Sequence, residues 1–332
     1  MTLDWLNITI AQTAAAATDT SPNTGPVAEI LSGYVGVFVV AFLVTLLATP
    51  IMRHLAINNG VVDNPDARKV HRIPVAYLGG VAVFLGLLAG VAFSYVGKMF
   101  LPSEVYSVHE SIHGQRDVPF SIILGMTLIM LTGLIDDVVG LMPRLKVAGQ
   151  LLAAAALAME NVGTNLARGV MRPIGEFVGN PDLTWMIELP AMLQPVLGSS
   201  IKIDIIYWVG TAMIAVFVLG ACNASNLIDG LDGLLTGVTA IAALCILIIA
   251  VNLAMLDFGG TAADHESLDA TRIIVSLCLL GACLGFLPHN FNPASIFLGD
   301  CGSLLMGYVT IVLVLDLRDV ELDNVSTTPE NA

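Results

Sequence analysis

The sequence predicts an all-α polytopic integral membrane protein with about eight transmembrane helices. Of the 332 residues, 56% are hydrophobic and only 12% are charged, whereas roughly 25% of the residues in a soluble domain are charged. The mean hydropathy is +0.84, and several charge-free stretches approach the roughly 20 apolar residues that a helix needs to cross a bilayer. The net charge of −14 leaves no basic surface to neutralise phosphates, so nucleic acid is not expected as a partner.

Eight apolar windows are the predicted spans, and the fourth and eighth are short enough to depend on uncharged flanks. In chain order they are Leu31–Met52, Leu78–Gly97, Val118–Ile135, Val147–Met159, Ile205–Ala221, Leu235–Leu256, Ile273–Leu287 and Ser303–Leu315. The stretch Asn161–Asp204 is too polar to span and is expected to hold a short hairpin. The segment before Gly25 has no basic start, so no cleaved signal peptide is expected.

Basic residues set the predicted orientation. They concentrate in the first and third loops between the spans: Arg53, Arg68, Lys69, Arg72, Arg144 and Lys146. The positive-inside rule places these loops in the cytoplasm and the N-terminus outside. With eight spans, the loops near 223–233 and 288–302 are cytoplasmic too. The chain thus divides into an external N-terminal segment (1–30), a transmembrane domain (31–315) and an acidic external tail (316–332).

Most of the 27 acidic residues fall on segments assigned to the outside, where they are solvated. The others lie in compact cytoplasmic motifs beside apolar helices, where ionised groups are costly and usually functional. These are Asp63, Asp66, Asp136, Asp137, Asp229, Asp232 and Asp300. The motifs that contain them are the candidate site.

The first cytoplasmic loop reads V-D-N-P-D-A-R-K-V-H-R-I-P over residues 62–74 and is followed by Gly79 and Gly80. Basic residues on a loop broken by prolines, followed by glycines that let the backbone approach a ligand, suit a phosphate-bearing substrate. Topology alone would explain the charge but not His71 or the paired glycines. The loop is therefore a candidate phosphate-binding segment.

The third loop opens with Asp136 and Asp137 at the end of the third window. Two adjacent carboxylates repel each other unless a cation or a proton neutralises them. The pair therefore implies a divalent metal or a basic substrate pocket, although a solvated helix end would have the same sequence.

Asn223, Asn226, Asp229 and Asp232 recur at a spacing of three residues. On a helix this spacing places them close to one face, so four oxygen-bearing side chains can converge on one site. Oxygen ligands suit magnesium and sugar or phosphate contacts rather than zinc. Polar bonding between helices is the structural alternative.

The last motif, F-N-P-A-S-I-F-L-G-D-C-G-S, covers residues 291–303. Asp300 lies between two glycines at the start of a window, where a carboxylate is well placed to hold a metal. Phe297 offers a ring that can stack on a planar base, and Asn292 is a further candidate substrate ligand.

Together and in this order, the motifs resemble the polyprenyl-phosphate N-acetylhexosamine-1-phosphate transferase superfamily, over about Leu31 to Leu315. The pattern D-x-P-x-x-R-K-x-H-x-x-P from Asp63 to Pro74 is more similar to the GlcNAc-1-phosphate branch than to the muramoyl-pentapeptide branch. The resemblance implies that undecaprenyl phosphate attacks the β-phosphorus of a UDP-N-acetylhexosamine, with GlcNAc favoured, to give a lipid diphosphosugar and UMP. It also implies a bacterial cytoplasmic membrane, a site on the cytoplasmic face and a first step of cell-envelope polysaccharide synthesis.

The same resemblance implies roles for individual residues. Mg²⁺, or Mn²⁺ in its place, is the implied cofactor, with Asp300 as its principal ligand. A phosphate monoester is already largely ionised near neutral pH, so the Asp pair is expected to position the lipid phosphate rather than deprotonate it. Lys69 is expected near the nucleotide and Phe297 on uracil. The predicted site residues have three roles. The catalytic residues are Asp136, Asp137, Asp229 and Asp232, and the metal ligand is Asp300. The substrate-binding residues are Lys69, His71, Asn223, Asn226, Asn292 and Phe297.

Three alternatives stay open on sequence alone. In the first, the donor is a muramoyl-pentapeptide nucleotide. In the second, the chain is a transporter that couples ions through intramembrane acids, although these acids sit at loop borders and no repeat is evident. In the third, the chain is an inactive truncated homologue. The last arises because family members continue into a histidine-rich loop and at least one more helix, whereas residues 316–332 are an acidic tail. Weak UDP-sugar binding and slow turnover are therefore expected. The assembly state, a homodimer included, is not set by the sequence.

Overall fold

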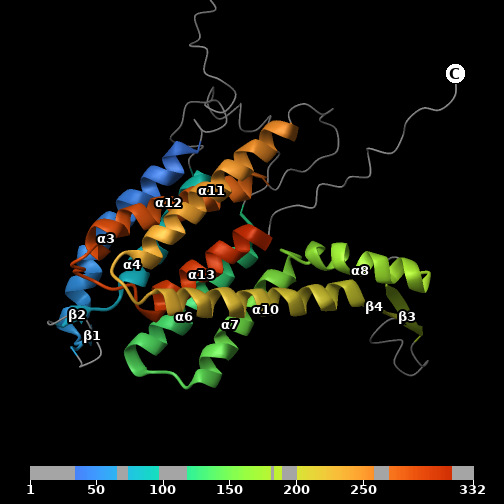
Figure 1. Ribbon diagram of the computed structural model, residues 1–332, viewed down its shortest axis with the longest axis horizontal. Helices are drawn as coiled ribbons and strands as arrows, with labels where there is room; N and C mark the ends of the chain where they lie inside the picture. The colour runs from blue at the N-terminus through green and yellow to red at the C-terminus, as the bar shows by residue number, and fades with distance from the viewer. Residues whose placement is uncertain are drawn as a thin grey trace, which may run out of the picture.

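The computed structural model describes residues 34–65, 74–96, 118–180, 183–188, 200–257 and 269–315, and most of them are helical (Figure 1). The helices are α3 (Val35–Asn58), α4 (Gly79–Val96), α6 (Phe120–Val139), α7 (Pro143–Met159), α8 (Asn165–Val178), α10 (Ile205–Ile228), α11 (Leu234–Asp257), α12 (Asp269–Asn290) and α13 (Gly299–Leu315). Two antiparallel strand pairs accompany them, β1 (Val62–Asp63) with β2 (Val75–Ala76) and β3 (Thr184–Glu188) with β4 (Ser200–Asp204). The predicted N-terminal segment and acidic tail lie outside the described residues.

The predicted class, an all-α polytopic membrane protein, is confirmed. Among the described residues, six helices are long and apolar enough to cross a bilayer, namely α3, α4, α6, α10, α11 and α12, and α13 is a shorter apolar helix. Large apolar side chains also cover the outside of the bundle, as lipid contact requires; Leu43, Leu47 and Ile51 of α3 are 45%, 65% and 57% exposed. Each of the eight predicted windows falls on a helix, the fourth on α7 and the eighth on α13. That all eight cross the membrane, with the N-terminus outside, stays a prediction.

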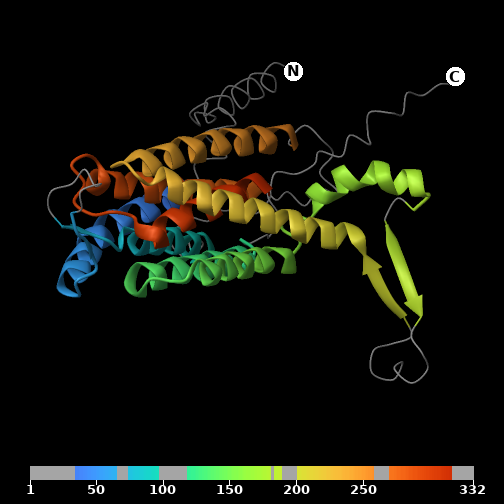
Figure 2. The same cartoon turned by 60° about the horizontal axis from the view of Figure 1, so that its bottom comes forward.

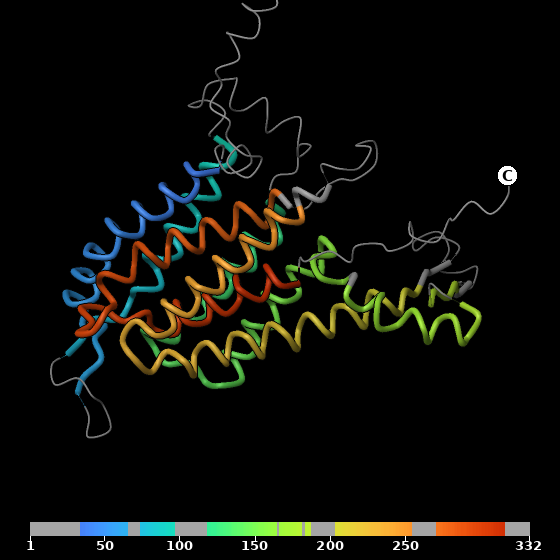
Figure 3. Tube along the Cα trace, turned by 45° about the horizontal axis from the view of Figure 1, so that its top comes forward, coloured from blue at the N-terminus to red at the C-terminus, as the bar shows by residue number. Residues whose placement is uncertain are grey.

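Helix α13 lies in the middle of the bundle (Figure 3) and is buried along nearly its whole length. It packs against α4, α6 and α10. Glycines allow these backbones to approach, because a Cβ atom on Gly133 of α6 would lie 2.4 Å from the Cα atom of Cys301, and one on Gly80 of α4 would lie 2.1 Å from the nitrogen of Gly302. Gly80, from the first predicted motif, and Gly133 therefore serve helix packing.

The helices run roughly side by side, with the short pair β1–β2 at one end and with α8 and the β3–β4 hairpin at the other (Figure 2). The hairpin was expected in the polar stretch, but α8 was not. Its glycines and internal Pro173 look like helix breakers, yet Leu166, Val170 and Ile174 recur every four residues along one side. This periodicity is typical of an amphipathic helix.

The first and last motifs are joined by main-chain hydrogen bonds. The Phe297 N–H donates to the Ala76 carbonyl at 2.9 Å, and the Gly79 and Gly80 N–H groups donate to the carbonyls of Phe297 and Leu298 at 3.0 and 2.9 Å. Arg53 of α3 adds a side-chain bond from Nε to the Ser295 carbonyl at 3.0 Å. These bonds hold the start of α4 against the loop that leads into α13.

Candidate active site

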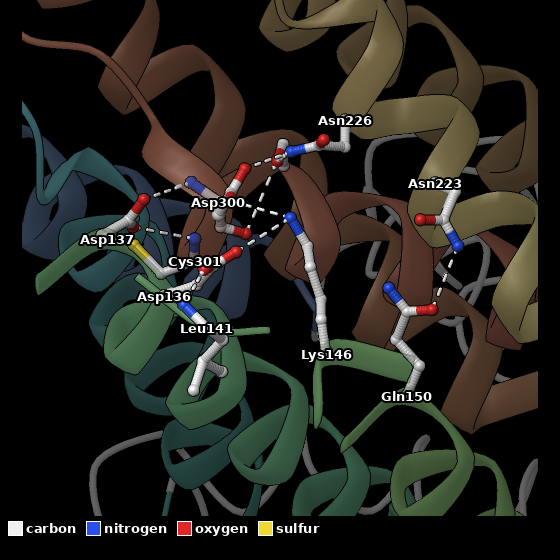
Figure 4. Close-up of polar contacts among 10 residues, drawn as sticks. Asp136, Asp137, Leu141, Lys146, Gln150, Asn223, Asn226, Asp300 and Cys301 are labelled. Atoms are coloured by element: carbon white, nitrogen blue, oxygen red, sulfur yellow. Dashed lines mark hydrogen bonds and ion pairs between the residues drawn. The ribbon is translucent and has the colours of Figure 1, made fainter. Parts of the chain in front are cut away.

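Asp136 and Asp137, at the end of α6, have different surroundings (Figure 4). Asp137 accepts the backbone N–H groups of Asp300 at 2.7 Å and Cys301 at 3.0 Å, so it caps the start of α13. Asp136 accepts the Leu141 N–H through Oδ1 at 2.6 Å, and its Oδ2 lies 3.0 Å from the Lys146 ammonium. The neutralising charges that the pair requires are therefore a helix N-terminus and a lysine.

Lys146 lies at the centre of the cluster. Its Nζ is 2.7 Å from Asp300 Oδ2 as well as 3.0 Å from Asp136 Oδ2. The turn at Gly140, where φ is +76°, brings the first turn of α7 back beside the end of α6. Burial opposes the charged ammonium, but the hydrogen bonds and charges of Asp300 and Asp136 outweigh it and raise the pKa of Lys146 above its ordinary value. In the sequence, Lys146 is one of the six basic residues that set the predicted orientation, and it was not among the predicted site residues.

Asn226 of α10 holds the other side of the Asp300 carboxylate. Its amide nitrogen donates to Asp300 Oδ1 and to the Ser303 hydroxyl, the latter at 2.9 Å. Asp300 thus receives hydrogen bonds from two neighbouring helices, and its backbone N–H is held by a third. Helices α6, α7, α10 and α13 together build the site.

The predicted convergence of four side chains on one site is wrong for Asp232 and for Asn223. Helix α10 ends at Ile228, and the turn that follows contains Gly233 at a φ of +73°. Asp232 consequently leaves the helical face and accepts hydrogen bonds from Asn292 Nδ2 at 3.1 Å and from the Ala294 N–H at 3.0 Å.

Asn223 stays on the helix but bonds to Gln150 of α7 at 3.0 Å and to the Leu219 carbonyl at 2.7 Å, away from Asp300. Gln150 is fully buried and lies one helical turn after Lys146. The contact therefore ties α10 to the helix that carries the lysine.

Asp229 follows directly after α10. Burial raises the pKa of its carboxyl to about 7, and the charges of Asp300 and Asp137 add to the effect. A carboxyl with this pKa changes its ionisation near neutral pH, which is common in functional sites.

Two aromatic rings border the acidic cluster. Phe297 is half-buried, and its ring lies 6.1 Å from that of Tyr77 at an angle of 55°. Burial, the charges of Asp63, Asp137 and Asp300, and a hydrogen bond with Asp63 raise the pKa of the Tyr77 hydroxyl, which stays protonated. Tyr77 was not predicted, because nothing in the loop pattern places its hydroxyl beside Asp137 and Asp300. Lys69 and His71 lie outside the described residues.

Asp136 and Asp300 fit a Mg²⁺ ion of the kind that binds with substrate. The two carboxylates come from different helices and already share one cation, Lys146. Among the described residues, no group of three or more His, Cys, Asp or Glu side chains is arranged to hold a metal. Mg²⁺ commonly takes one or two carboxylates and completes its shell with water and substrate phosphates. The donor set suits that arrangement rather than a cage made of protein ligands alone.

Comparison with known proteins finds relatives of this chain among bacterial proteins. A decaprenyl-phosphate N-acetylglucosaminephosphotransferase of Mycobacterium tuberculosis is 35% identical over 267 residues, covering 80% of this chain and 56% of that protein. A probable undecaprenyl-phosphate N-acetylglucosaminyl 1-phosphate transferase of Bacillus subtilis is 32% identical over 279 residues, covering 84% and 61%. The chain thus spans about three fifths of the length of these two relatives.

A phospho-N-acetylmuramoyl-pentapeptide-transferase of Desulforudis audaxviator is 30% identical over 281 residues, covering 81% of this chain and 71% of that protein. Residues 119–318, which include every acidic residue of the cluster around Lys146, match the family described as Glycosyl transferase family 4. The chain therefore belongs to glycosyl transferase family 4.

Proposed function

We propose that this chain transfers N-acetylhexosamine 1-phosphate, in the first place GlcNAc 1-phosphate, from a UDP-sugar to undecaprenyl phosphate and releases UMP. The names of the mycobacterial and Bacillus relatives support the sugar and the acceptor class. The observation that carries the proposal is the cluster of Asp136, Lys146 and Asp300 at one end of a membrane bundle. Two phosphate-bearing substrates need positive charge where they meet, and one of them carries a long apolar tail that requires the bilayer.

The reaction forms one bond to phosphorus and breaks another. An oxygen of the lipid phosphate attacks the β-phosphorus, and the bond from this phosphorus to the oxygen bridging to the α-phosphorus breaks, so UMP leaves with the electron pair. Because a phosphate monoester is already largely ionised at neutral pH, the attack needs no strong base. The work of the protein is to position the two phosphates and to stabilise the charge on the transferred group.

Each residue of the cluster has a separate role in this positioning and stabilisation. A bound Mg²⁺ would supply charge neutralisation, and Asp300 and Asp136 would hold it. Asn226 and Asp137 fix Asp300 by its side chain and by its backbone, while Lys146 offers an ammonium to phosphate oxygens. Phe297 provides a half-buried ring for uracil. Lys69 and His71 are proposed to contact the nucleotide diphosphate.

We also place this end of the bundle on the cytoplasmic side of a bacterial cytoplasmic membrane. Arg53, Arg144 and Lys146 lie at this end, and the orientation predicted from the basic loops puts it on the cytoplasmic side. The placement gives a water-soluble nucleotide-sugar direct access to the site.

Transfer is tested with detergent-solubilised protein, Mg²⁺, undecaprenyl phosphate and radiolabelled UDP-GlcNAc, with UDP-MurNAc-pentapeptide as the competing donor. The expected result is label in the organic phase from UDP-GlcNAc, together with UMP, and no transfer by Asp300→Asn. If only UDP-MurNAc-pentapeptide acts as a donor, the transferred sugar is MurNAc-pentapeptide and not GlcNAc. Absence of transfer from any UDP-sugar by folded protein would refute the proposal.

A further inference from the structure

We propose that Lys146 is an exchangeable internal cation. In the absence of a divalent ion its ammonium holds Asp136 and Asp300 together, and a divalent ion that binds these carboxylates displaces it. The inference rests on the proposed function only in its final step, where the displaced ammonium turns to substrate phosphate. The displacement itself needs only the protein and a metal.

In each of the two carboxylates, one oxygen accepts a neutral N–H group and the other faces the Lys146 ammonium. Asp136 Oδ1 accepts the Leu141 N–H, and Asp300 Oδ1 accepts the Asn226 amide. The remaining oxygens, Oδ2 of each residue, both face Lys146 Nζ at 3.0 and 2.7 Å. An ion that bridges these carboxylates through the Oδ2 atoms, at Mg²⁺ bond lengths of about 2.0–2.1 Å, competes with Lys146 for the same two atoms.

Asp137 offers no alternative pair of oxygens. Both of its oxygens accept backbone N–H groups from the first turn of α13. Releasing them would leave the start of a buried helix without acceptors, which is costly. The lysine is therefore the group that yields when a cation arrives.

The side chain of Lys146 is free to move without a change in the backbone. It lies on the first turn of α7, at the end of a flexible four-carbon stem. The side chains of Lys146, Asp136 and Asp300 are 18%, 13% and 30% exposed, so water reaches the cluster. Rotation about the stem can carry the ammonium off the carboxylates while the helix stays in place.

The exchange reverses the local charge. Asp136 and Asp300 with Lys146 carry one net negative charge, which disfavours a phosphate. A divalent ion added to the same three groups makes the net charge positive by one and leaves the ammonium with its donors unpaired. Cation binding would thereby prepare an anion site, and the coupling between the two ligands is reciprocal.

The test uses Mn²⁺ as a spectroscopic probe, with free Mn²⁺ measured by electron paramagnetic resonance in detergent at pH 8 without substrate. Lys146→Met removes the competitor and should tighten Mn²⁺ binding by about tenfold or more, whereas Lys146→Arg should not. The matched control is Arg144→Met, which removes the same charge two residues away at an exposed position and should change the affinity by less than about twofold. Unchanged or weaker binding by Lys146→Met would refute the exchange. So would tight binding by Lys146→Met that survives the addition of Asp300→Asn.

A second measurement uses the wild-type chain and does not depend on the folding of a variant. Lysine amines are acylated with and without Mg²⁺, and the modified sites are quantified by mass spectrometry. Mg²⁺ should raise the labelling of Lys146 severalfold relative to the other lysines, and equal or reduced labelling would contradict displacement. Neither measurement contains a nucleotide-sugar or lipid. A chain that exchanges its lysine but transfers no sugar would refute the proposed function alone, and an active transferase without exchange would refute this inference alone.

Discussion

Asp137 on α6 accepts the backbone N–H of Asp300 on α13 at 2.7 Å, so one acidic residue of the site positions the other through the main chain. Its second oxygen takes the Cys301 N–H at 3.0 Å. A helix N-terminus carries partial positive charge and unpaired donors, which makes a carboxylate favourable there. Asp137 thus connects the end of one helix to the beginning of another, while Asp136 faces Lys146.

This difference predicts unlike effects of mutation at the two positions. Asp137→Ala removes the cap and should lower stability by about 1–2 kcal/mol, together with transfer activity. Asp136→Asn keeps an acceptor for the Leu141 N–H and should leave the thermal midpoint nearly unchanged while transfer falls at least about a hundredfold. Thermal unfolding in detergent and the radiolabel assay measure the two effects. Equal loss of stability in both variants would show that the two carboxylates do not have these separate roles.

Asp300→Asn is expected to abolish transfer without unfolding the protein. The substitution keeps the backbone N–H that Asp137 accepts, but it removes a charge that faces Lys146 and would face the metal. Activity should fall below about 1% of wild type, with an unchanged circular dichroism spectrum. Undiminished turnover at limiting Mg²⁺ would remove Asp300 from the metal site.

Asp229 should make stability depend on pH. Its folded-state pKa of about 7 lies above the ordinary value, so the folded protein keeps a proton that the unfolded chain releases. The free energy of unfolding contributed by this group therefore falls as pH rises from about 4 to about 7. In metal-free buffer at pH 8, Asp229→Asn should unfold at a temperature a few degrees higher than wild type, and the difference should shrink toward pH 5. A difference that is constant over this range would argue against the raised pKa.

Gly80 is predicted to tolerate no side chain. A Cβ atom there would lie 2.1 Å from the nitrogen of Gly302, with backbone on both sides of the contact. Gly80→Ala should therefore cost about 1–3 kcal/mol through overpacking, seen as a lower thermal midpoint. Gly220→Ala is the control, because its Cβ position on α10 has no atom within 4 Å apart from the adjacent residues and backbone of its own helix. That variant should be neutral or slightly stabilising.

The proposed orientation is tested with a pair of single cysteines in a chain whose five natural cysteines have been replaced. Leu231 is 63% exposed at the motif end of the bundle, and Phe177 is 93% exposed on α8 at the other end. An impermeant thiol reagent applied to intact cells should label Phe177→Cys and spare Leu231→Cys. The reverse pattern would invert the topology.

Hydropathy and charge were sufficient to predict the apolar helices and the motifs that carry acid, but not the amphipathic helix α8. They could not predict that Asp136 and Asp137 have different partners, because the bond from Asp300 to Asp137 spans 163 positions of the chain. Lys146 was missed for the same reason. A basic residue at the start of a span is a normal orientation signal, and only the fold brings it between Asp136 and Asp300.

The prediction for Asp232 failed because a spacing of three residues indicates one face only while the helix continues. The end of α10 at Ile228 depends on a local turn at Gly233 and on hydrogen bonds to the loop before α13. The sequence supplies the glycine but not the partner loop. Likewise, Asn223 turned out to face Gln150, a residue on a different helix.

The main-chain bonds between the start of α4 and residues 296–298 impose an order of events during synthesis. Arg53 and its partner Ser295 are 242 positions apart, and ribosomes add about 5–20 residues per second, so roughly 10–50 s separate the appearance of the two sides of this contact. Throughout that interval the N–H groups of Gly79 and Gly80 have no Phe297 or Leu298 carbonyl to bond. The nascent chain therefore sits in the membrane with its first motif incomplete. These carbonyls arrive only with the loop that leads into α13, and until then the half-made protein depends on water or on the insertion machinery to satisfy the exposed N–H groups.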